Sequence, residues 1–115
     1  MYLFTWETDF GNGLYKAGHA VEVPFVFDLV DSVPIAGTRW DKRELAASMS
    51  EAWIAFSRNG DPNHPLIPKW ERYSRNHRAT MIFNVPCRTE LDPGRADLDA
   101  WKGIESELQR VPPED

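Results

Sequence analysis

The sequence predicts a small α+β domain with two main helices and a few short strands. The chain has 115 residues, which is the length of one domain that buries a single compact core. Two segments, one in the middle of the chain and one near its C-terminus, carry apolar residues at helical spacing. Short runs of aromatic and branched residues, which are typical of strands, precede both segments. We expect one structural unit over residues 1–111, followed by a polar tail over 112–115.

A strand followed by a long loop is expected at the N-terminus. Residues 2–7 are aromatic and branched, and their alternation places the aromatic rings on one face. We expect both faces of this strand to be largely buried. Turn residues follow at 9–13, and the loop beyond them contains His19. Pro24 predicts an extended backbone at Val23, because a proline ring disfavours helical angles in the residue before it.

The best-defined element is a helix through the middle of the chain. Asp41 and Glu44 match a capping box, in which the N-cap side chain and the third helical side chain each bond the other's backbone N–H. Apolar residues then recur at helical spacing, at Leu45, Met49, Trp53 and Phe56. We expect the helix to run to about Asn59 and to end at Gly60.

A loop and a strand follow this helix. Residues 60–65 include Gly60 and two prolines, so they cannot continue the helix. The loop leads to Trp70 and Tyr73, whose rings we expect to cover the underside of the helix. Residues 80–83 are apolar and branched or aromatic for the most part, and they predict a strand.

A second amphipathic helix is expected near the C-terminus. Asp92 matches an N-cap, and Pro93 suits the first helical position, where no backbone N–H is needed. The apolar residues at helical spacing are Leu98, Trp101, Ile104 and Leu108.

Composition and charge argue against several classes of partner. The net charge is −5 at pH 7 and no long basic run is present, so we expect no binding to nucleic acid. No apolar stretch reaches the roughly 18 residues that a membrane span needs, so we expect no membrane partner. The single cysteine, Cys87, excludes an internal disulfide and favours a reducing, cytoplasmic compartment.

Neither a metal nor a cofactor is expected. The three histidines, His19, His64 and His77, share no short spacing typical of metal ligands. The glycine-containing segments at 11–13 and 60–63 match no phosphate-binding motif, and turn geometry explains them.

His19 is the residue most suited to chemistry. It follows Gly18 in a loop just after a predicted strand, and ligands in open α/β sheets gather beyond the carboxyl ends of strands. Its imidazole titrates near neutral pH, so it can act as a base with little adjustment of its pKa. The alternative is an ordinary loop histidine that only forms hydrogen bonds, and the local sequence leaves both open.

Glu22 and Cys87 are weaker candidates. Glu22 lies three residues after His19, where its carboxylate can accept backbone N–H bonds within the loop, support a catalytic site, or do both. Cys87 precedes an arginine, which can lower the pKa of a thiol, but its neighbours favour inert packing at a strand end. None of the serines lies in a Gly-x-Ser-x-Gly motif, so the sequence presents no nucleophile for His19 to activate.

Several segments agree in order and spacing with one protein family. They are Gly18-His19, 22–27, 45–49, 53–56, 59–63, 68–70 and Tyr73. Together they resemble the C-terminal part of type B carboxylesterases, the α/β-hydrolase family that includes para-nitrobenzyl esterases and cholinesterases. The resemblance extends over about residues 2–101.

This resemblance implies a fold, an activity and site residues. The fold is the C-terminal portion of an α/β-hydrolase. His19 is implied to be the general base of a Ser-Glu/Asp-His triad, and Glu22 to support the site from behind without being the triad acid. In family members the serine, the acid and the oxyanion-hole glycines lie upstream, and this sequence lacks them. We therefore expect a carboxylic ester as substrate only together with an upstream segment, and no turnover by the chain alone.

The alternative is a non-catalytic interaction module derived from the same fold. The strand at 2–7 then presents an aromatic edge without a partner, and proteins usually cover such edges. This hypothesis predicts self-association into a homo-oligomer.

Overall fold

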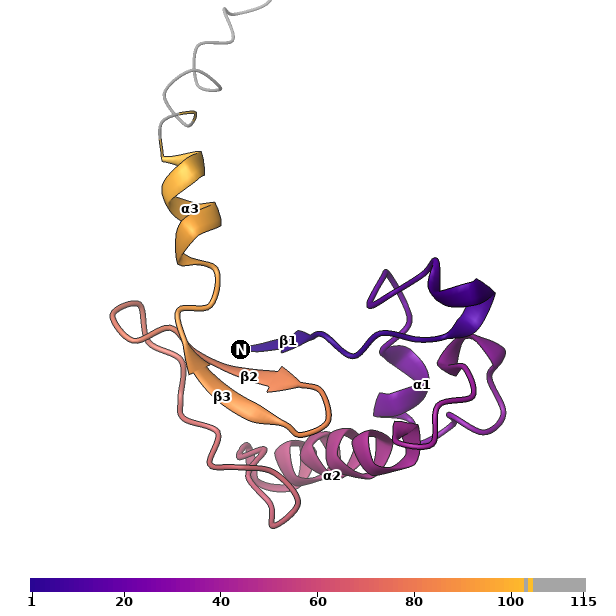
Figure 1. The fold of residues 1–115 in the computed structure, drawn as a ribbon. Helices are drawn as coiled ribbons and strands as arrows, with labels where there is room; N and C mark the ends of the chain where they lie inside the picture. Colours follow the sequence, from indigo (N-terminus) through magenta and orange to yellow (C-terminus); the bar gives the residue numbers. More distant parts are fainter. Residues whose placement is uncertain (103, 105–115) are drawn as a thin grey trace, which may run out of the picture.

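A three-stranded sheet and one long helix form the body of the protein (Figure 1). The computed structural model describes residues 1–102 and 104. Within them the sheet contains β1 (Tyr2–Phe4), β2 (Ala79–Phe83) and β3 (Arg88–Leu91), in the order β1-β2-β3. β1 runs parallel to β2, and β3 runs antiparallel to it. The pairing of β1 with β2 places the N-terminal strand beside a strand from the C-terminal half of the chain.

The helices differ in length and in their packing. α2 (Lys42–Asn59) lies beneath the sheet, and the single turn α1 (Val23–Val26) packs against it. α3 (Arg95–Trp101) projects away from the body (Figure 1). Two short 3-10 turns, Phe10–Gly13 and Pro34–Ala36, lie in the loops on either side of α1.

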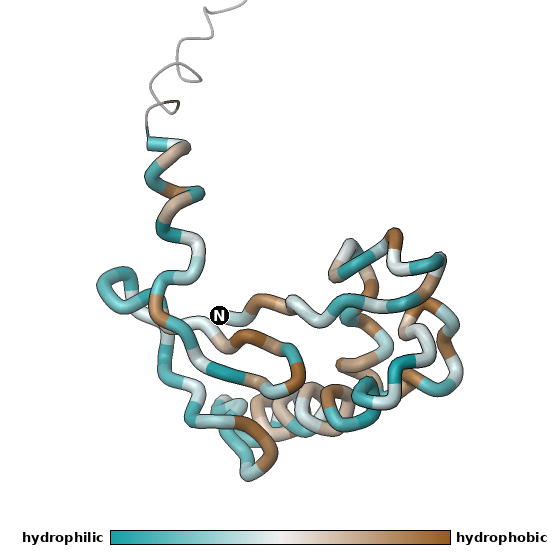
Figure 2. The backbone as a smooth tube through the Cα atoms, in the orientation of Figure 1, coloured by the Kyte–Doolittle hydropathy of each residue, from teal (hydrophilic) through white to brown (hydrophobic). Residues whose placement is uncertain are grey.

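The core lies between α2 and the sheet. β2 is buried along its whole length, and Figure 2 shows it as a mainly hydrophobic strand. Trp53 of α2 lies against the rings of Phe83 and Tyr2, with centroid distances of 6.0 and 5.1 Å. Leu45 and Met49, from the same face of α2, are buried in this core. Leu45, Met49 and Trp53 of the predicted α2 stripe therefore form the helix side of the core, whereas Phe56, its last member, is 59% exposed.

The predicted end of α2 is confirmed, whereas the predicted capping box is wrong. The helix ends at Asn59, and Gly60 follows in the left-handed conformation with φ of 75°. At the other end, Asp41 precedes the helix but its side chain makes no bond to a helical N–H. The Asp41 carboxylate instead accepts bonds from Trp6 and Arg39. A tertiary contact has replaced the local capping interaction.

The first strand is shorter and more exposed than predicted. β1 ends at Phe4, and the expectation that both of its faces are largely buried is wrong: Tyr2 is 38% exposed and Leu3 47% exposed. Among the described residues, β1 pairs with a neighbouring strand on one side only, so it is an edge strand. Trp6, beyond the strand, is fully buried.

Pro24 begins a helix, so the extended backbone predicted at Val23 is wrong. Val23 and Pro24 are the first two residues of α1. Proline is tolerated there because the first turn of a helix needs no backbone N–H donors.

The C-terminal helix begins later than predicted. α3 starts at Arg95, and Asp92 adopts a positive φ of 51° outside it. The Asp92 carboxylate forms ion pairs with Arg78 at 3.0 Å and with Arg95 at 2.7 Å, which explains why it does not cap the helix. β3 was not predicted. Leu108 and the tail at 112–115 lie outside the described residues.

Candidate functional site

His19 lies in an exposed loop between β1 and α1. The chain leaves β1, passes Thr8, turns through Phe10–Gly13 and returns to Lys16. There the Thr8 N–H donates to the Lys16 carbonyl at 3.1 Å, which closes the base of the loop. His19 follows three residues later with an exposed side chain. A group from outside this loop can therefore reach the imidazole, as a general base requires.

The backbone is constrained on both sides of His19, by a close contact at Gly18 and by a positive φ at Ala20. A Cβ on Gly18 would lie 2.7 Å from the Tyr15 carbonyl oxygen, to which the Gly18 N–H donates a bond of 2.8 Å. Glycine is therefore needed at this position for close approach. Ala20 has a φ of 69°, a conformation that costs a non-glycine residue about 1–2 kcal/mol. Such strain is found mostly where a side chain must be held in a defined place.

Glu22 terminates the loop through its backbone. It is half-buried at the N-cap of α1, and its carbonyl accepts bonds from Phe25 N–H at 3.0 Å and Val26 N–H at 3.2 Å. Within residues 1–102 and 104, no backbone N–H donates to its carboxylate, so of the two interpretations left open by the sequence the structure gives no support to loop fixing by this side chain. The side chain lies close in sequence to His19 and adds a negative charge to this part of the surface.

A buried carboxylate lies behind the loop, and we did not predict it. Asp41 is 5% exposed and accepts bonds from Trp6 Nε1–H at 3.2 Å and from Arg39 Nε–H at 3.0 Å. The Arg39 guanidinium also lies 4.9 Å from the centre of the Trp6 ring. The bonds from Arg39, and to a smaller degree the one from Trp6, hold the pKa of Asp41 below its usual value. Because Trp6 and Asp41 are distant in sequence, no local pattern pointed to this cluster.

Comparison with known proteins identifies the family. The model of the carboxylesterase family matches residues 1–101. The chain belongs to the carboxylesterase family. The resemblance predicted from the sequence is confirmed, and the described residues form part of an α/β-hydrolase fold.

Relatives of this carboxylesterase-family chain are considerably longer. The para-nitrobenzyl esterase of Bacillus subtilis is 31% identical over 96 residues, covering 81% of this chain and 19% of that protein. The phenmedipham hydrolase of Pseudarthrobacter oxydans is 27% identical, covering 70% of this chain and 17% of that protein. The chain thus spans about a fifth of the length of the relatives it matches.

Solved structures of esterases share its fold. An esterase from Clostridium hathewayi that hydrolyses aliphatic aromatic polyesters superimposes with a TM-score of 0.78 at 32% identity, covering 89% of this chain and 20% of that one. A carboxylesterase from Geobacillus stearothermophilus gives a TM-score of 0.73 at 35% identity, covering 88% of this chain and 21% of that one.

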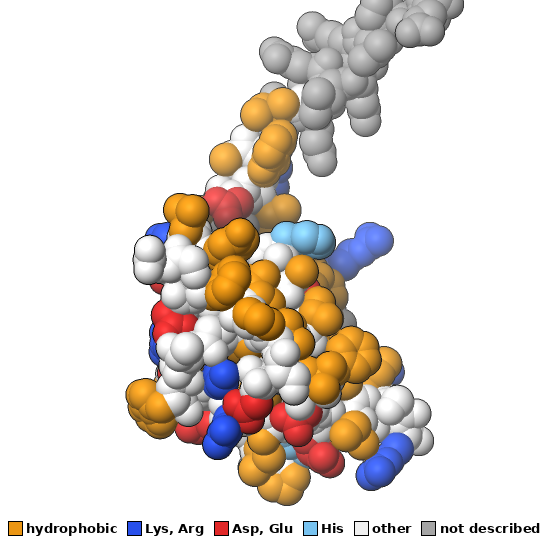
Figure 3. Space-filling model, turned by 90° about the vertical axis from the view of Figure 1, so that its right-hand side faces the viewer, with side chains coloured by type: hydrophobic (Ala, Val, Ile, Leu, Met, Phe, Trp, Pro, Cys, Tyr) orange, Lys and Arg blue, Asp and Glu red, His pale blue; other side chains and the backbone are white. Residues whose placement is uncertain are grey.

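The surface near the His19 loop of this carboxylesterase-family chain is unusually apolar. Figure 3 shows the side of the molecule that carries α1, with many hydrophobic side chains gathered on it. Within residues 10–40, Leu14 is 83% exposed and Trp40 is 85% exposed. Such exposure is typical of surfaces that contact another polypeptide or a ligand.

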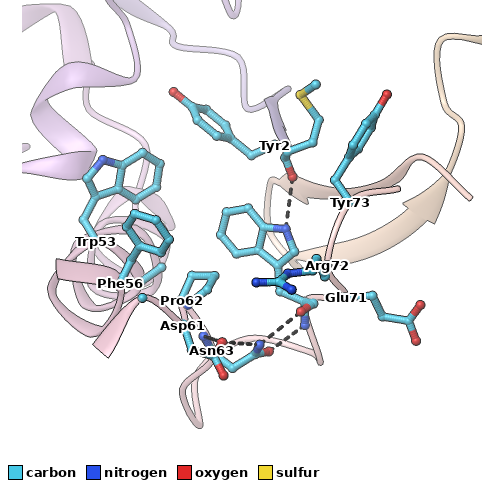
Figure 4. Close-up of a pocket in the computed structure, with 13 residues that line it drawn as sticks. Tyr2, Trp53, Phe56, Asp61, Pro62, Asn63, Glu71, Arg72 and Tyr73 are labelled. Atoms are coloured by element: carbon cyan, nitrogen blue, oxygen red, sulfur yellow. Dashed lines mark hydrogen bonds between the residues drawn. The ribbon is translucent and has the colours of Figure 1, made fainter. Parts of the chain in front are cut away.

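A separate aromatic groove lies along the C-terminal half of α2 (Figure 4). Its volume is about 680 Å³, and Trp53, Phe56 and Trp70 are among the residues that line it. The side-chain amide of Asn63 holds the Trp70 backbone with two bonds, of 2.7 and 3.0 Å. Phe56 is 59% exposed, and Trp70 and Tyr73 line an open groove instead of covering the underside of the helix as predicted. Neither His19 nor Glu22 lines this groove.

The remaining candidate groups have structural surroundings. His64 Nε2 lies 3.0 Å from the Ser48 carbonyl oxygen, and burial raises the pKa of the Cys87 thiol. In the described part of the chain, no group of three or more His, Cys, Asp or Glu residues is placed to hold a metal ion. No described helix is long and apolar enough to cross a membrane.

Gly18→Ala tests the close approach beside His19. We expect it to lower the free energy of unfolding by about 1–3 kcal/mol, because the new methyl group overlaps the Tyr15 carbonyl. Gly94→Ala is the matched control: a Cβ there meets nothing within 4 Å, so its effect should stay within about 0.5 kcal/mol. Urea denaturation measures both. Equal losses in the two variants would show that the Gly18 contact is unimportant.

Asp41→Asn tests the buried carboxylate through its dependence on pH. The folded-state pKa of Asp41 is lowered, so its contribution is fully present above the unfolded pKa of about 3.9 and is lost as pH falls through the folded pKa. We expect the variant to be less stable near neutral pH and the two stability curves to converge in acid. Urea denaturation at a series of pH values provides the measurement. If the parent and the variant differed in stability by the same amount at every pH, the lowered pKa of Asp41 would be contradicted.

Proposed function

We propose that His19 is the general base in the hydrolysis of a carboxylic ester. In this proposal the nucleophilic serine, the triad acid and the oxyanion donors come from polypeptide outside this sequence. The observation that carries it is the exposed imidazole on a constrained loop after the carboxyl end of β1, in a chain of the carboxylesterase family. Catalytic groups in α/β folds gather at that end of the strands.

The role of His19 follows from the chemistry of acyl transfer. The imidazole accepts the proton of the serine hydroxyl as the oxygen attacks the ester carbonyl, and later returns it to the leaving alcohol. Both transfers require the ring nitrogen to stay within hydrogen-bond distance of the reacting oxygen. A loop with Gly18 packed against Tyr15 and Ala20 in a strained conformation suits this requirement, since few alternative backbone positions remain for His19.

The substrate class is proposed from the same family membership. The relatives named above are esterases or hydrolases, and their shared chemistry supports an ester of a carboxylic acid. Glu22 is proposed to support the imidazole electrostatically once a second polypeptide covers this surface. Without a nucleophile and an oxyanion hole, the base alone lacks the groups that provide most of the rate enhancement, so we expect no turnover by residues 1–115.

A hybrid enzyme tests the role of His19. Residues 1–101 replace the matching segment of the Bacillus subtilis para-nitrobenzyl esterase, and hydrolysis of a p-nitrophenyl ester is measured. We expect activity that falls at least about 1,000-fold in His19→Gln, because no other group takes the proton. The matched control is His77→Gln, an exposed histidine in the loop before β2, which should leave activity within about twofold. Equal activity of the His19→Gln hybrid and its parent would refute the proposal.

Self-association is the second candidate function, and the exposed edge of β1 favours it. Tyr2 and Leu3 project from a strand that has a partner on one side only within the described residues. A second copy of the chain can cover both side chains and pair with the free edge. In this alternative the chain is an interaction module without catalysis.

Light scattering distinguishes this alternative from a monomer. We expect a dimer or larger assembly at micromolar concentration, and Leu3→Lys should shift it toward monomer because a charge on an edge strand opposes pairing. Arg88→Lys on β3 is the control that preserves charge. A monodisperse monomer of the parent chain would argue against self-association. Esterase activity of the hybrid enzyme is expected only if His19 acts as the general base.

A further inference from the structure

Four consecutive residues between β1 and the His19 loop are tied to the segment 35–41. The bonds are Trp6 Nε1–H to Asp41 Oδ1 at 3.2 Å, Arg39 Nη1–H to the Glu7 carbonyl at 3.3 Å, the Thr8 hydroxyl to the Ile35 carbonyl at 2.8 Å, and the Thr38 N–H to Asp9 Oδ1 at 2.7 Å. The Thr38 hydroxyl adds a bond to Asp9 Oδ2. We call residues 35–41 the brace.

The brace is itself held in place by glycine and lysine. Gly37 has a φ of 66°, and a Cβ there would lie 1.9 Å from Asp9 Oδ1. Glycine is thus required both by its backbone angle and by the approach of the carboxylate. The Lys42 ammonium donates to the Gly37 carbonyl at 2.8 Å and to the Val30 carbonyl at 2.9 Å, which ties the brace to the start of α2.

Thr8 is the point at which the brace meets the His19 loop. It is 2% exposed, and its hydroxyl donates to Ile35 while accepting the Phe10 N–H at 3.0 Å. Its backbone N–H donates to the Lys16 carbonyl at 3.1 Å. One residue therefore links the brace, the first turn of the loop and the segment at Lys16 that leads to His19.

The geometry points to Thr8 and Asp9 as positioning residues for the reaction of His19, acting by fastening the base of its loop to the brace. This inference rests on the proposed function, because it assigns a role to residues that contact neither substrate nor the reacting atoms. The Asp9 carboxylate is well suited to this role, because it accepts both the backbone N–H and the hydroxyl of Thr38, and these bonds lower its pKa.

The first experiment measures the order of the loop in the chain itself. Thr8→Val keeps the shape of the side chain and removes its hydroxyl. We expect the amide protons of Gly18 and Val21, which donate to Tyr15 and Gly18 respectively, to exchange with solvent at least about tenfold faster. The exchange rates of the α2 amides should change much less. Global unfolding would speed up exchange in the loop and in α2 alike, so a difference between them shows that only the loop has loosened.

The second experiment measures catalysis in the hybrid enzyme described above. We expect Thr8→Val to lower kcat about 10- to 100-fold with little change in KM, because displacement of the base weakens proton transfer more than binding. Thr8→Ser, which restores the hydroxyl, should recover most of the rate. The matched control is Thr89→Val. Thr89 lies on β3, far along the chain from the brace, and its hydroxyl donates a comparable bond to the Lys69 carbonyl.

Asp9→Ala provides a second variant should Thr8→Val fail to fold. Asp9 is exposed, so its removal cuts both Thr38 bonds without opening the core. We expect the same faster exchange at Gly18 and Val21, and the same loss in kcat.

The outcomes separate this inference from the proposed function. Unchanged exchange, or faster exchange with unchanged kcat in the hybrid, overturns the positioning role. Full activity of the His19→Gln hybrid overturns the proposed function instead, whatever the brace variants show. Faster exchange together with a lowered kcat that Thr8→Ser restores supports the inference.

Discussion

The position of the His19 loop depends on the burial of Trp6. A buried indole needs an acceptor for its N–H, and the acceptor here is the carboxylate of Asp41. A buried carboxylate needs a cation in turn, and Arg39 supplies it while also lying over the Trp6 ring. Each group makes the next one necessary, so the segment after β1 and the segment before α2 are fixed to each other.

This cluster also explains why the brace follows Trp6 residue by residue. Once Arg39 and Asp41 are held by the indole, the residues before them run alongside the chain that leads to His19. Thr38 and Ile35 then meet Asp9 and Thr8 at hydrogen-bond distance. The Asp41 carboxylate of this ion pair is buried while the Arg39 side chain is 42% exposed, so the pair contributes little net stability. Separating its members, however, would leave a buried carboxylate without its cation, which is costly. Its main consequence here is a defined path for the backbone.

Sequence reasoning succeeded where local interactions decide the structure. The end of α2 at Gly60 requires only a residue that accepts a left-handed backbone, and β2 requires only a run of apolar residues. It was wrong at Asp41, because a capping motif is read from neighbours and the actual partner, Trp6, is remote in sequence. The catalytic role of His19 was predicted from its local motif and a family resemblance, and it stays a prediction. The brace was not predicted, since no short spacing links residues 6–9 to residues 35–41.

The proposed role of His19 as a general base has requirements that two sources would meet. The backbone position of His19 is determined within this chain, by Gly18, Ala20 and the link through Thr8. Its imidazole, however, is open to water, and nearby segments expose large apolar side chains such as Leu14 and Trp40. Burial of such side chains is favourable at about 25 cal/mol per Å², so this surface favours a covering polypeptide. Covering it would also exclude water and strengthen every electrostatic contact to the imidazole, which is what the proposed role of His19 as a base requires.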